Sequence, residues 1–144
     1  MSRTLSKFLH KVCHFDEGEM TKYSINFKPL KMSYKLFLDD IRDVKMVYKD
    51  LSDDDFVIVR NFHDFKKVIL ENGLPKFISF DNDLGLDEND LIAEDGYACV
   101  KWLVYDSEIN LKDLKFYVHS ANPVARQQIK SLLDNYIKHL KNQE

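Results

Sequence analysis

Four short apolar runs constrain the fold of this 144-residue chain more than any other feature. They lie at Leu36–Leu38, Phe56–Val59, Phe77–Phe80 and Phe116–Val118. Three of them are near-continuous rather than alternating, which is typical of parallel strands that are covered on both faces. Because parallel strands are joined by crossover connections, the stretches between the runs have to supply the covering layers.

Helical patterns occupy most of these stretches. Asn61 is placed as the N-cap of a helix that ends at the sequence NGLP, and a second helix is expected from about Gly96 to Asp106. The segment from Ile41 to Asp55 is weakly periodic and is expected to be mostly loop. The clearest helix is the last, whose apolar positions are Ile129, Leu132, Leu133, Tyr136, Ile137 and Leu140. The order of elements predicts an α/β fold, a three-layer parallel sheet of about four strands.

The first part of the chain differs from the rest. Residues 1–33 are interpreted as an N-terminal extension, a short amphipathic helix followed by an extended segment, and residues 34–144 as the α/β domain. The helix is expected because apolar residues recur at helical spacing, at Leu5, Phe8, Leu9 and Val12. His10, Cys13 and His14 have spacing typical of metal ligands, but without a fourth ligand we interpret them as chance. A homo-oligomer formed through residues 1–33 is one possible role for the extension.

Composition excludes several classes of protein. The net charge is −3, which argues against duplex DNA as a partner because phosphate binding needs a basic surface. Two cysteines give no disulfide framework, and no secretory or membrane-spanning run is present, so a cytoplasmic location is expected. The aromatic residues fall at positions predicted to face the core, so we expect no surface for stacking of bases.

The polar residues that follow each apolar run are the strongest functional signal. In open α/β sheets, ligands bind beyond the carboxyl ends of the strands, so these residues are predicted to meet at one edge. Carboxylates from different strands would repel one another there unless a cation compensates or one carboxylate is protonated. A hard divalent ion such as Mg²⁺ would resolve the repulsion. The residues in question are Asp39, Asp40, Arg42, Arg60, Asn61, Asp81, Asn82, Asp83, Gly85, His119, Ser120, Asn122 and Pro123.

Each of these groups also has a purely structural interpretation. Asp39 and Asp40 could be ordinary strand-end polarity, and Asp83 could belong to a turn with its neighbouring glycine. Asn122 before a proline is a typical helix N-cap, although the same helix end would also offer N–H groups to an anion. His119 is either a structural side chain or a general acid, since its ordinary pKa is near ~6.5.

Four stretches at the strand ends resemble the phosphoacceptor receiver domains of response regulators. They read LFLDD, FISFD, EDGYACVKWL and FYVHSAN. The resemblance implies a receiver/flavodoxin-like fold in which Asp39 and Asp40 bind a metal and Asp81 is the phosphoacceptor or nucleophile. It also implies that the Ser120 hydroxyl contacts phosphate. Receiver domains continue to a fifth strand that ends in a lysine, whereas this sequence has one helix after HSAN.

A closer resemblance is to the cyclic-phosphate-processing receiver-like family. The pattern of that family is similar to LDDIRDV, DNDLG, EDGYACVKWL and VHSANP here, with Val44 in place of a proline. The resemblance runs from about Leu36 to the C-terminus. It implies a metal-dependent phosphoesterase that acts on a cyclic nucleotide or on a 2′,3′-cyclic RNA end.

The roles that follow from this resemblance are specific. Asp81 and His119 would be catalytic, with His119 protonating the leaving oxygen. Mg²⁺, or another divalent cation, would bind to Asp39, Asp40 and Asp81. Phosphate would bind to Arg42, Ser120 and Asn122, and Asp83 would have a secondary role.

Two alternatives remain open at the level of sequence. The same residues could bind a cyclic nucleotide or phosphate without cleaving it, in a non-catalytic module or degenerate receiver. The chain could also be a phosphorylated signalling receiver, which the absence of a fifth strand and its lysine disfavours.

Overall fold

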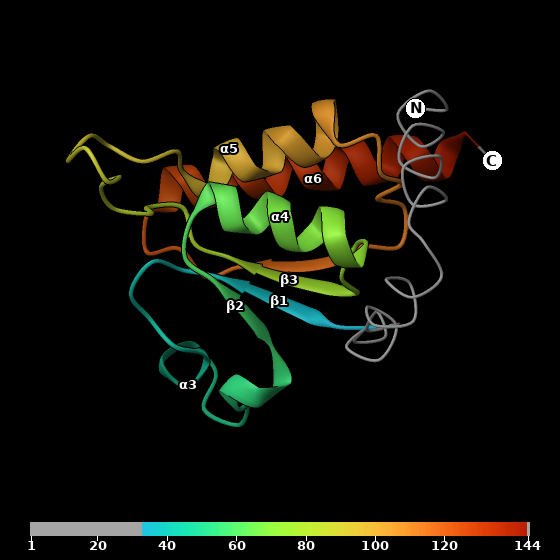
Figure 1. The fold of residues 1–144 in the computed structure, drawn as a ribbon. Helices are drawn as coiled ribbons and strands as arrows, with labels where there is room; N and C mark the ends of the chain where they lie inside the picture. The colour runs from blue at the N-terminus through green and yellow to red at the C-terminus, as the bar shows by residue number, and fades with distance from the viewer. Residues whose placement is uncertain (1–32, 144) are drawn as a thin grey trace, which may run out of the picture. The chain divides into compact units, whose positions relative to one another are not determined.

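A sheet of four parallel strands forms the centre of the computed structural model, which describes residues 33–143. The strands are β1 (Lys35–Leu38), β2 (Val57–Val59), β3 (Phe77–Phe80) and β4 (Lys115–Val118), in the spatial order β2-β1-β3-β4 (Figure 1). The predicted parallel α/β fold is confirmed, and three of the strands differ from the predicted runs by a single residue at one end. β3 lies where it was predicted.

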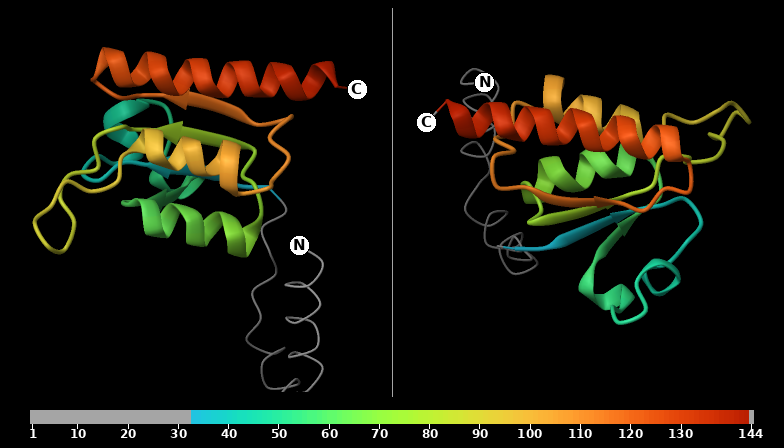
Figure 2. Two further views of the ribbon diagram at one scale, coloured as in Figure 1. Left: turned by 90° about the horizontal axis from the view of Figure 1, so that it is seen from above. Right: turned by 180° about the vertical axis from the view of Figure 1, so that it is seen from behind.

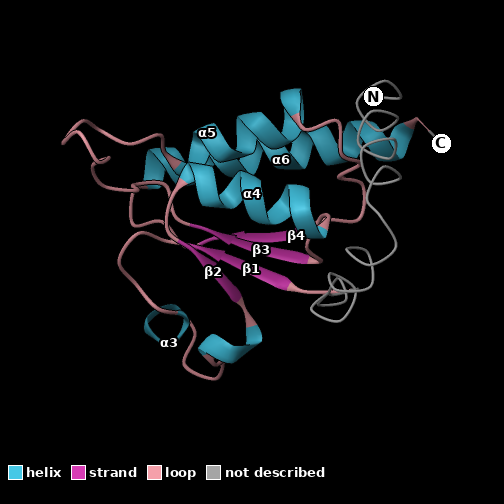
Figure 3. Cartoon of the chain, viewed as in Figure 1, coloured by secondary structure: helices cyan, strands magenta, loops and turns pink. Residues whose placement is uncertain are grey.

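Three helices cover one face of the sheet. These are α4 (Phe62–Asn72), α5 (Gly96–Lys101) with its π-helical continuation η2 (Trp102–Asp106), and α6 (Pro123–Asn142) (Figures 1 and 3). Leu36 and Leu38 of β1 and Ile78 and Phe80 of β3 point into the core beneath them. The helices begin where the sequence predicted. Asn61 accepts a hydrogen bond from the Asp64 N–H at 2.8 Å, and the sequence Asn-Pro likewise begins α6.

The layer on the opposite face is thin. Successive residues of a strand point to opposite faces, so Phe37 points away from the helices and packs with Val44 and Phe56. Among residues 33–143, the covering elements there are only α3 (Val44–Val47) and the 3₁₀ turn η1 (Asp53–Asp55), joined by loop. The prediction that this connection is mostly loop is therefore confirmed.

The expectation that the aromatic residues all face the core is wrong for two tyrosines. Tyr117 of β4 is 51% exposed and Tyr105 is 68% exposed. Tyr117 is exposed because β4 is the last strand of the sheet and α3 covers the side where β1 and β2 lie (Figure 1). An aromatic ring is thus available at the surface after all.

Several predictions fall outside the described residues. They concern the N-terminal helix, the spacing of His10, Cys13 and His14, and an oligomer formed through residues 1–33; the predicted boundary of the extension stays a prediction. Within residues 33–143, no helix is long and apolar enough to cross a membrane.

Gly96 is expected to be indispensable for the junction between β3 and α5. Its N–H donates to the Asn82 carbonyl at 2.8 Å, and a Cβ at this position would lie 1.9 Å from the backbone oxygen of Asp81. We predict that Gly96→Ala lowers the free energy of unfolding by about 3 kcal/mol or more, measured by urea denaturation.

Gly73→Ala is the matched control. Gly73 has a φ of +82° and a ψ of 177°, a conformation that strongly favours glycine, but no atom lies near its would-be Cβ. The cost of Gly73→Ala is therefore backbone strain without a steric clash, about 1–3 kcal/mol. Equal losses in the two variants would contradict the close approach of the helix start to Asp81.

Candidate functional site

The register of the sheet brings three polar residues together. Leu38, Phe80 and Val118 lie side by side across β1, β3 and β4, and each is followed directly by a polar residue. The hydrogen-bond pattern of the sheet continues one residue beyond the strands. The Asp81 N–H donates to the Leu38 carbonyl at 2.9 Å, and the His119 N–H donates to the Phe80 carbonyl at 2.8 Å. Asp39, Asp81 and His119 are therefore neighbours at the carboxyl edge, as the sequence predicted for strand ends.

Alternation along the strands decides which face these side chains occupy. Asp39, Asp81 and His119 follow residues that point into the helical core, so they project toward the thin layer formed by α3. Asp40 and Ser120 come one position later and project the other way. Asp40 lines a separate cavity of about 1030 Å³ that includes Arg60 and the loop around Gly85.

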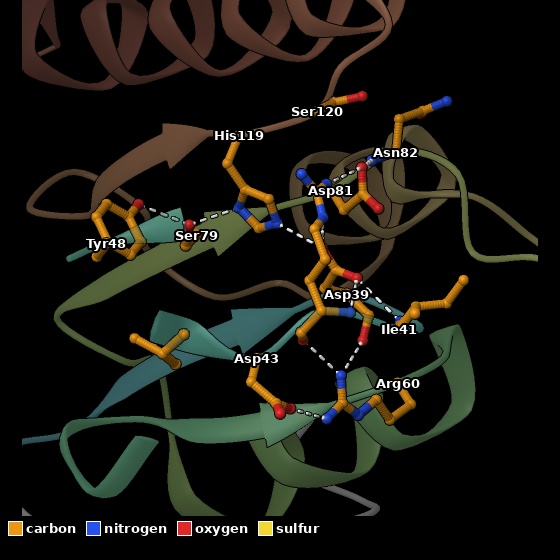
Figure 4. A network of polar contacts seen from close by, with 12 residues as sticks. Asp39, Ile41, Asp43, Tyr48, Arg60, Ser79, Asp81, Asn82, His119 and Ser120 are labelled. Atoms are coloured by element: carbon orange, nitrogen blue, oxygen red, sulfur yellow. Dashed lines mark hydrogen bonds and ion pairs between the residues drawn. The ribbon is translucent and has the colours of Figure 1, made fainter. Parts of the chain in front are cut away.

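Asp39 is the most heavily bonded of the three. It is 1% exposed, and its Oδ1 accepts hydrogen bonds from the N–H groups of Ile41 at 2.9 Å and Arg42 at 2.7 Å (Figure 4). Its Oδ2 lies 2.8 Å from Arg42 Nε and 3.0 Å from His119 Nε2. Burial by itself raises the pKa of Asp39. The hydrogen bonds from those two N–H groups and from His119, together with the charge of Arg42, outweigh it and lower the pKa below its usual value. Asp39 is therefore ionised.

Asp81 is in the opposite situation. It is 6% exposed and accepts a hydrogen bond from the Asn82 N–H at 2.8 Å. Burial and the neighbouring charge of Asp39 raise the pKa of Asp81, and the hydrogen bond from Asn82 and the proximity of Arg42 only partly offset them. The carboxylate of Asp81 is thus the less stable of the two charges.

Arg42 supplies a positive charge between these carboxylates. Its Nε contacts Asp39 and its Nη2 lies 3.3 Å from Asp81 Oδ1. The sequence predicted that such a pair of acids requires compensation, and in this structure the guanidinium provides part of it. Arg42 side-chain exposure is 33%, so the group remains open to a ligand from solvent.

His119 is the inner end of a chain of hydrogen bonds. Its Nδ1 lies 2.7 Å from Ser79 Oγ, which lies 2.7 Å from the Tyr48 hydroxyl (Figure 4). Its ring stacks on Phe37 with centroids 4.7 Å apart. Burial lowers the pKa of His119, and its contact with Asp39 only partly offsets this effect.

The hydrogen-bond pattern fixes the neutral tautomer of His119. An ionised Asp39 can only accept, so Nε2 carries the proton and donates it to Asp39 Oδ2. Nδ1 then accepts from the Ser79 hydroxyl, which in turn accepts from Tyr48. Sequence reasoning missed Ser79 and Tyr48. The available signal was Ser79 itself, because a hydroxyl inside a buried strand needs a partner.

The three clustered side chains could hold a metal ion. Asp39, Asp81 and His119 each offer one ligand atom, and these atoms lie within 4.8 Å of one another. Two carboxylates and an imidazole suit a divalent cation, and the imidazole favours a transition metal such as Mn²⁺ or Zn²⁺ over Mg²⁺. Asp40, predicted as a ligand, is outside this group.

The other predicted site residues have mainly local contacts. Ser120 is buried and its Oγ accepts from the Asn122 N–H at 3.2 Å. Asn122 caps α6 by accepting from the N–H groups of Val124 and Ala125. Asp83 is exposed and accepts from the Asn82 side chain at 3.2 Å. None of the three takes part in the cluster around His119.

A cavity of about 430 Å³ opens beside the cluster on the thin-layer face. Two arginines and two tyrosines line this cavity together with His119. One of the arginines, Arg126, was not predicted from the sequence. Arg126 lies in the first turn of α6, where its N–H donates to the Asn122 carbonyl at 3.0 Å. The sequence signal that could have identified it is a basic residue four positions after the predicted N-cap. The lining residues are Arg42, Met46, Val47, Tyr48, Tyr117, His119 and Arg126.

This fold and this strand-end site define a receiver-like α/β domain. A family model described as a cyclic-phosphate processing receiver domain matches residues 34–135. The chain belongs to that family. No curated protein and no solved structure matches the chain.

We predict that Asp81→Asn makes the metal-free protein more heat-stable at neutral pH. The substitution removes a buried charge that burial and Asp39 both disfavour. Thermal unfolding in EDTA should show a Tm that is higher by a few degrees. Asp83→Asn, an exposed neighbour, is the control and should leave the Tm unchanged. A lower Tm for Asp81→Asn would show that the ion pair with Arg42 outweighs the cost of burial.

The burial of neutral His119 predicts a pH dependence of stability. A folded pKa below the ordinary 6.5 means that the unfolded chain takes up a proton first as the pH falls. The stabilisation contributed by His119 is therefore present above about pH 6.5 and lost as the pH falls through its folded pKa. The free energies of unfolding of wild type and His119→Gln, measured in urea, should approach one another as the pH falls from 7.5 to 5. His63→Gln, a change at an exposed histidine, should follow wild type throughout.

Proposed function

We propose that this protein is a phosphoesterase that hydrolyses a cyclic phosphodiester of a nucleotide or of an RNA end, with the help of a divalent cation. The observation that carries the proposal is the buried group of Asp39, Asp81 and His119, which borders a cavity with two arginines. The description of the family to which the chain belongs names cyclic-phosphate processing, which supports the same class of substrate.

The cavity has the right charges for a phosphodiester. Arg42 and Arg126 present guanidinium groups, which bind phosphate oxygens through paired N–H donors. Ser120 and Asn122 stay proposed as further phosphate contacts near the start of α6. The phosphate would then lie within reach of His119 and beside the two carboxylates.

The proposed reaction opens the ring by adding water to phosphorus. The bond from phosphorus to one ribose oxygen breaks, and that oxygen takes up a proton. Asp81 is proposed as the base that removes a proton from the attacking water. Alternatively, Asp81 is the nucleophile: it forms an aspartyl phosphate ester as the ring opens, and water then hydrolyses that ester and releases the Asp81 carboxylate. A divalent cation bound at Asp39 and Asp81 would neutralise negative charge on the phosphate. Asp40, predicted from the sequence as a further ligand, lies outside that group.

His119 can have only one of two roles at a time. Its Nδ1 is engaged by Ser79, so Nε2 is the nitrogen that faces the site. To act as a general acid, the neutral ring first takes up a second proton, so that giving one to the leaving oxygen returns a neutral imidazole. To coordinate the cation, Nε2 instead gives up its proton and Nδ1 carries the one proton of the ring toward Ser79. If His119 is the general acid, the variant His119→Gln should reduce turnover by about 10²- to 10⁴-fold and leave the cation-induced rise in Tm intact. If His119 is instead a ligand of the cation, the same variant should lose both turnover and the rise in Tm.

A non-catalytic phosphate-binding module is the second candidate. The observation that favours it is Arg42, which already spans Asp39 and Asp81 and balances part of their charge without a cation. Such a module would bind a cyclic nucleotide through the same arginines. It would not turn the nucleotide over.

The proposed activity is tested by direct assay of the full chain. The protein would be incubated with Mg²⁺, Mn²⁺ or Zn²⁺ and a panel of 2′,3′-cyclic mononucleotides, RNA with cyclic ends, 3′,5′-cyclic nucleotides and cyclic dinucleotides, with products read by mass spectrometry. We expect cation-dependent ring opening of one class, abolished in Asp81→Asn and retained in Asp83→Asn. Ligand-induced thermal shifts without any product would instead establish the binding module.

A further inference from the structure

A third cavity lies along the outer edge of the sheet. It has a volume of about 350 Å³ and is formed between β4 and α6. β4 is the last strand of the described sheet, and α6 runs alongside it (Figure 2). We refer to this cavity as the edge groove. Its lining residues are Leu114, Lys115, Phe116, Tyr117, Val118, Arg126, Lys130, Asp134, Ile137 and Lys141.

The charge of the edge groove is opposite to that of the rest of the domain. Residues 32–144 contain 15 Lys and Arg against 21 Asp and Glu, a formal charge of −6. The groove nevertheless has four basic side chains and one acid, Asp134, which pairs with Lys130. That pair is largely exposed, so it is screened by solvent and leaves Lys130 able to bind an anion.

Spacing along α6 spreads these charges into a track. Arg126, Lys130, Asp134, Ile137 and Lys141 are three or four residues apart and therefore lie on one side of the helix. At 1.5 Å per residue, the distance from Arg126 to Lys141 is roughly 22 Å along the helix axis. Lys115 adds a charge from the strand side. A track of this length can contact several consecutive phosphates.

The edge groove and the cavity at His119 share two lining residues. Tyr117 and Arg126 line both of them. Tyr117 is half exposed, and its ring lies 6.1 Å from that of Tyr48 at a tilt of 59°. An exposed aromatic ring beside a basic track is the arrangement with which proteins stack a base of a single strand.

We propose that the edge groove binds a single strand of RNA whose 3′ end occupies the cavity at His119. This inference rests on the proposed function and deepens it, because it assigns the substrate to oligonucleotide ends rather than to free cyclic nucleotides. Lys115, Lys130 and Lys141 contact backbone phosphates, and Arg126, which lines both cavities, contacts the terminal cyclic phosphate. Tyr117 stacks on a base next to the cyclic end.

A strand of another protein fits the edge groove less well. β4 has only four residues and begins with Lys115, and charged lysines on an edge strand discourage pairing with further strands. The basic side chains of α6 face the same space. Charge therefore favours a polyanion over a peptide backbone or a second copy of this acidic chain.

The test compares binding and turnover in the full chain. Labelled single-stranded RNA of about eight nucleotides with a 2′,3′-cyclic end would be titrated by fluorescence anisotropy at several salt concentrations. The slope of log K against log salt should be about −0.7 per phosphate contacted. Lys130→Glu/Lys141→Glu should weaken binding about tenfold or more and flatten the slope. Lys67→Glu, an exposed lysine of α4, should leave both unchanged.

Tyr117→Ala tests the stacking contact. Loss of one stacked base should weaken binding by about fivefold or more while the salt slope stays the same. Turnover of a 2′,3′-cyclic mononucleotide should be unaffected by the double lysine variant, whereas kcat/KM for the oligonucleotide should fall. This separates the edge groove from the site at His119.

The outcomes are distinguishable. If cyclic mononucleotides are cleaved as efficiently as oligonucleotides and the lysine variant changes neither, the edge groove proposal is overturned and the proposed activity stands. If RNA binds through the lysines but no substrate is cleaved, the groove is supported and the activity is overturned. A dimer that the lysine variant dissociates without change in RNA affinity would identify the groove as an interface between copies, which also overturns the proposal.

Discussion

The site depends on two buried carboxylates that the parallel register forces together. Asp39 and Asp81 follow paired residues of neighbouring strands, so they cannot avoid one another without breaking the sheet. The structure makes them unequal: hydrogen bonds and Arg42 stabilise the charge on Asp39, whereas burial and Asp39 itself destabilise the charge on Asp81. A group with a disfavoured charge beside an open cavity is ready to bind a cation or to react. In the proposed function, this destabilised charge on Asp81 is the group that binds the cation or reacts.

The remaining polar groups are arranged around this asymmetry. His119 is fixed from one side by Asp39 and from the other by Ser79, so neither its position nor its tautomer is free. Stacking on Phe37 holds the plane of the ring. The thin layer on this face is what makes the arrangement useful, because a full helical layer would bury the cavity from which Arg42 and Arg126 reach a ligand.

Sequence patterns predicted the fold and the edge at which the site lies, for a clear physical reason. Near-continuous apolar runs indicate parallel strands, and polar residues directly after them must share an edge. The patterns could not decide between Asp39 and Asp40, because that choice depends on which face each side chain occupies at the strand end. They also missed Ser79, Tyr48 and Arg126, whose roles depend on contacts between segments distant in sequence. The exposure of Tyr117 was not predicted because it depends on the position of β4 at the edge of the described sheet and not on the type of residue.

The order of strands links the two cavities. With β4 at the edge of the described sheet, the side of that strand is open, and α6 follows it closely enough to form the second wall of a groove. In receiver domains a fifth strand continues the sheet beyond this point, as the resemblance of the motifs implies. In the described part of this chain the sheet ends at β4, and the same position is lined by lysines and an arginine. The geometric consequence is a basic track that leads to His119, and it explains how an acidic domain could still select a polyanionic substrate at a single edge.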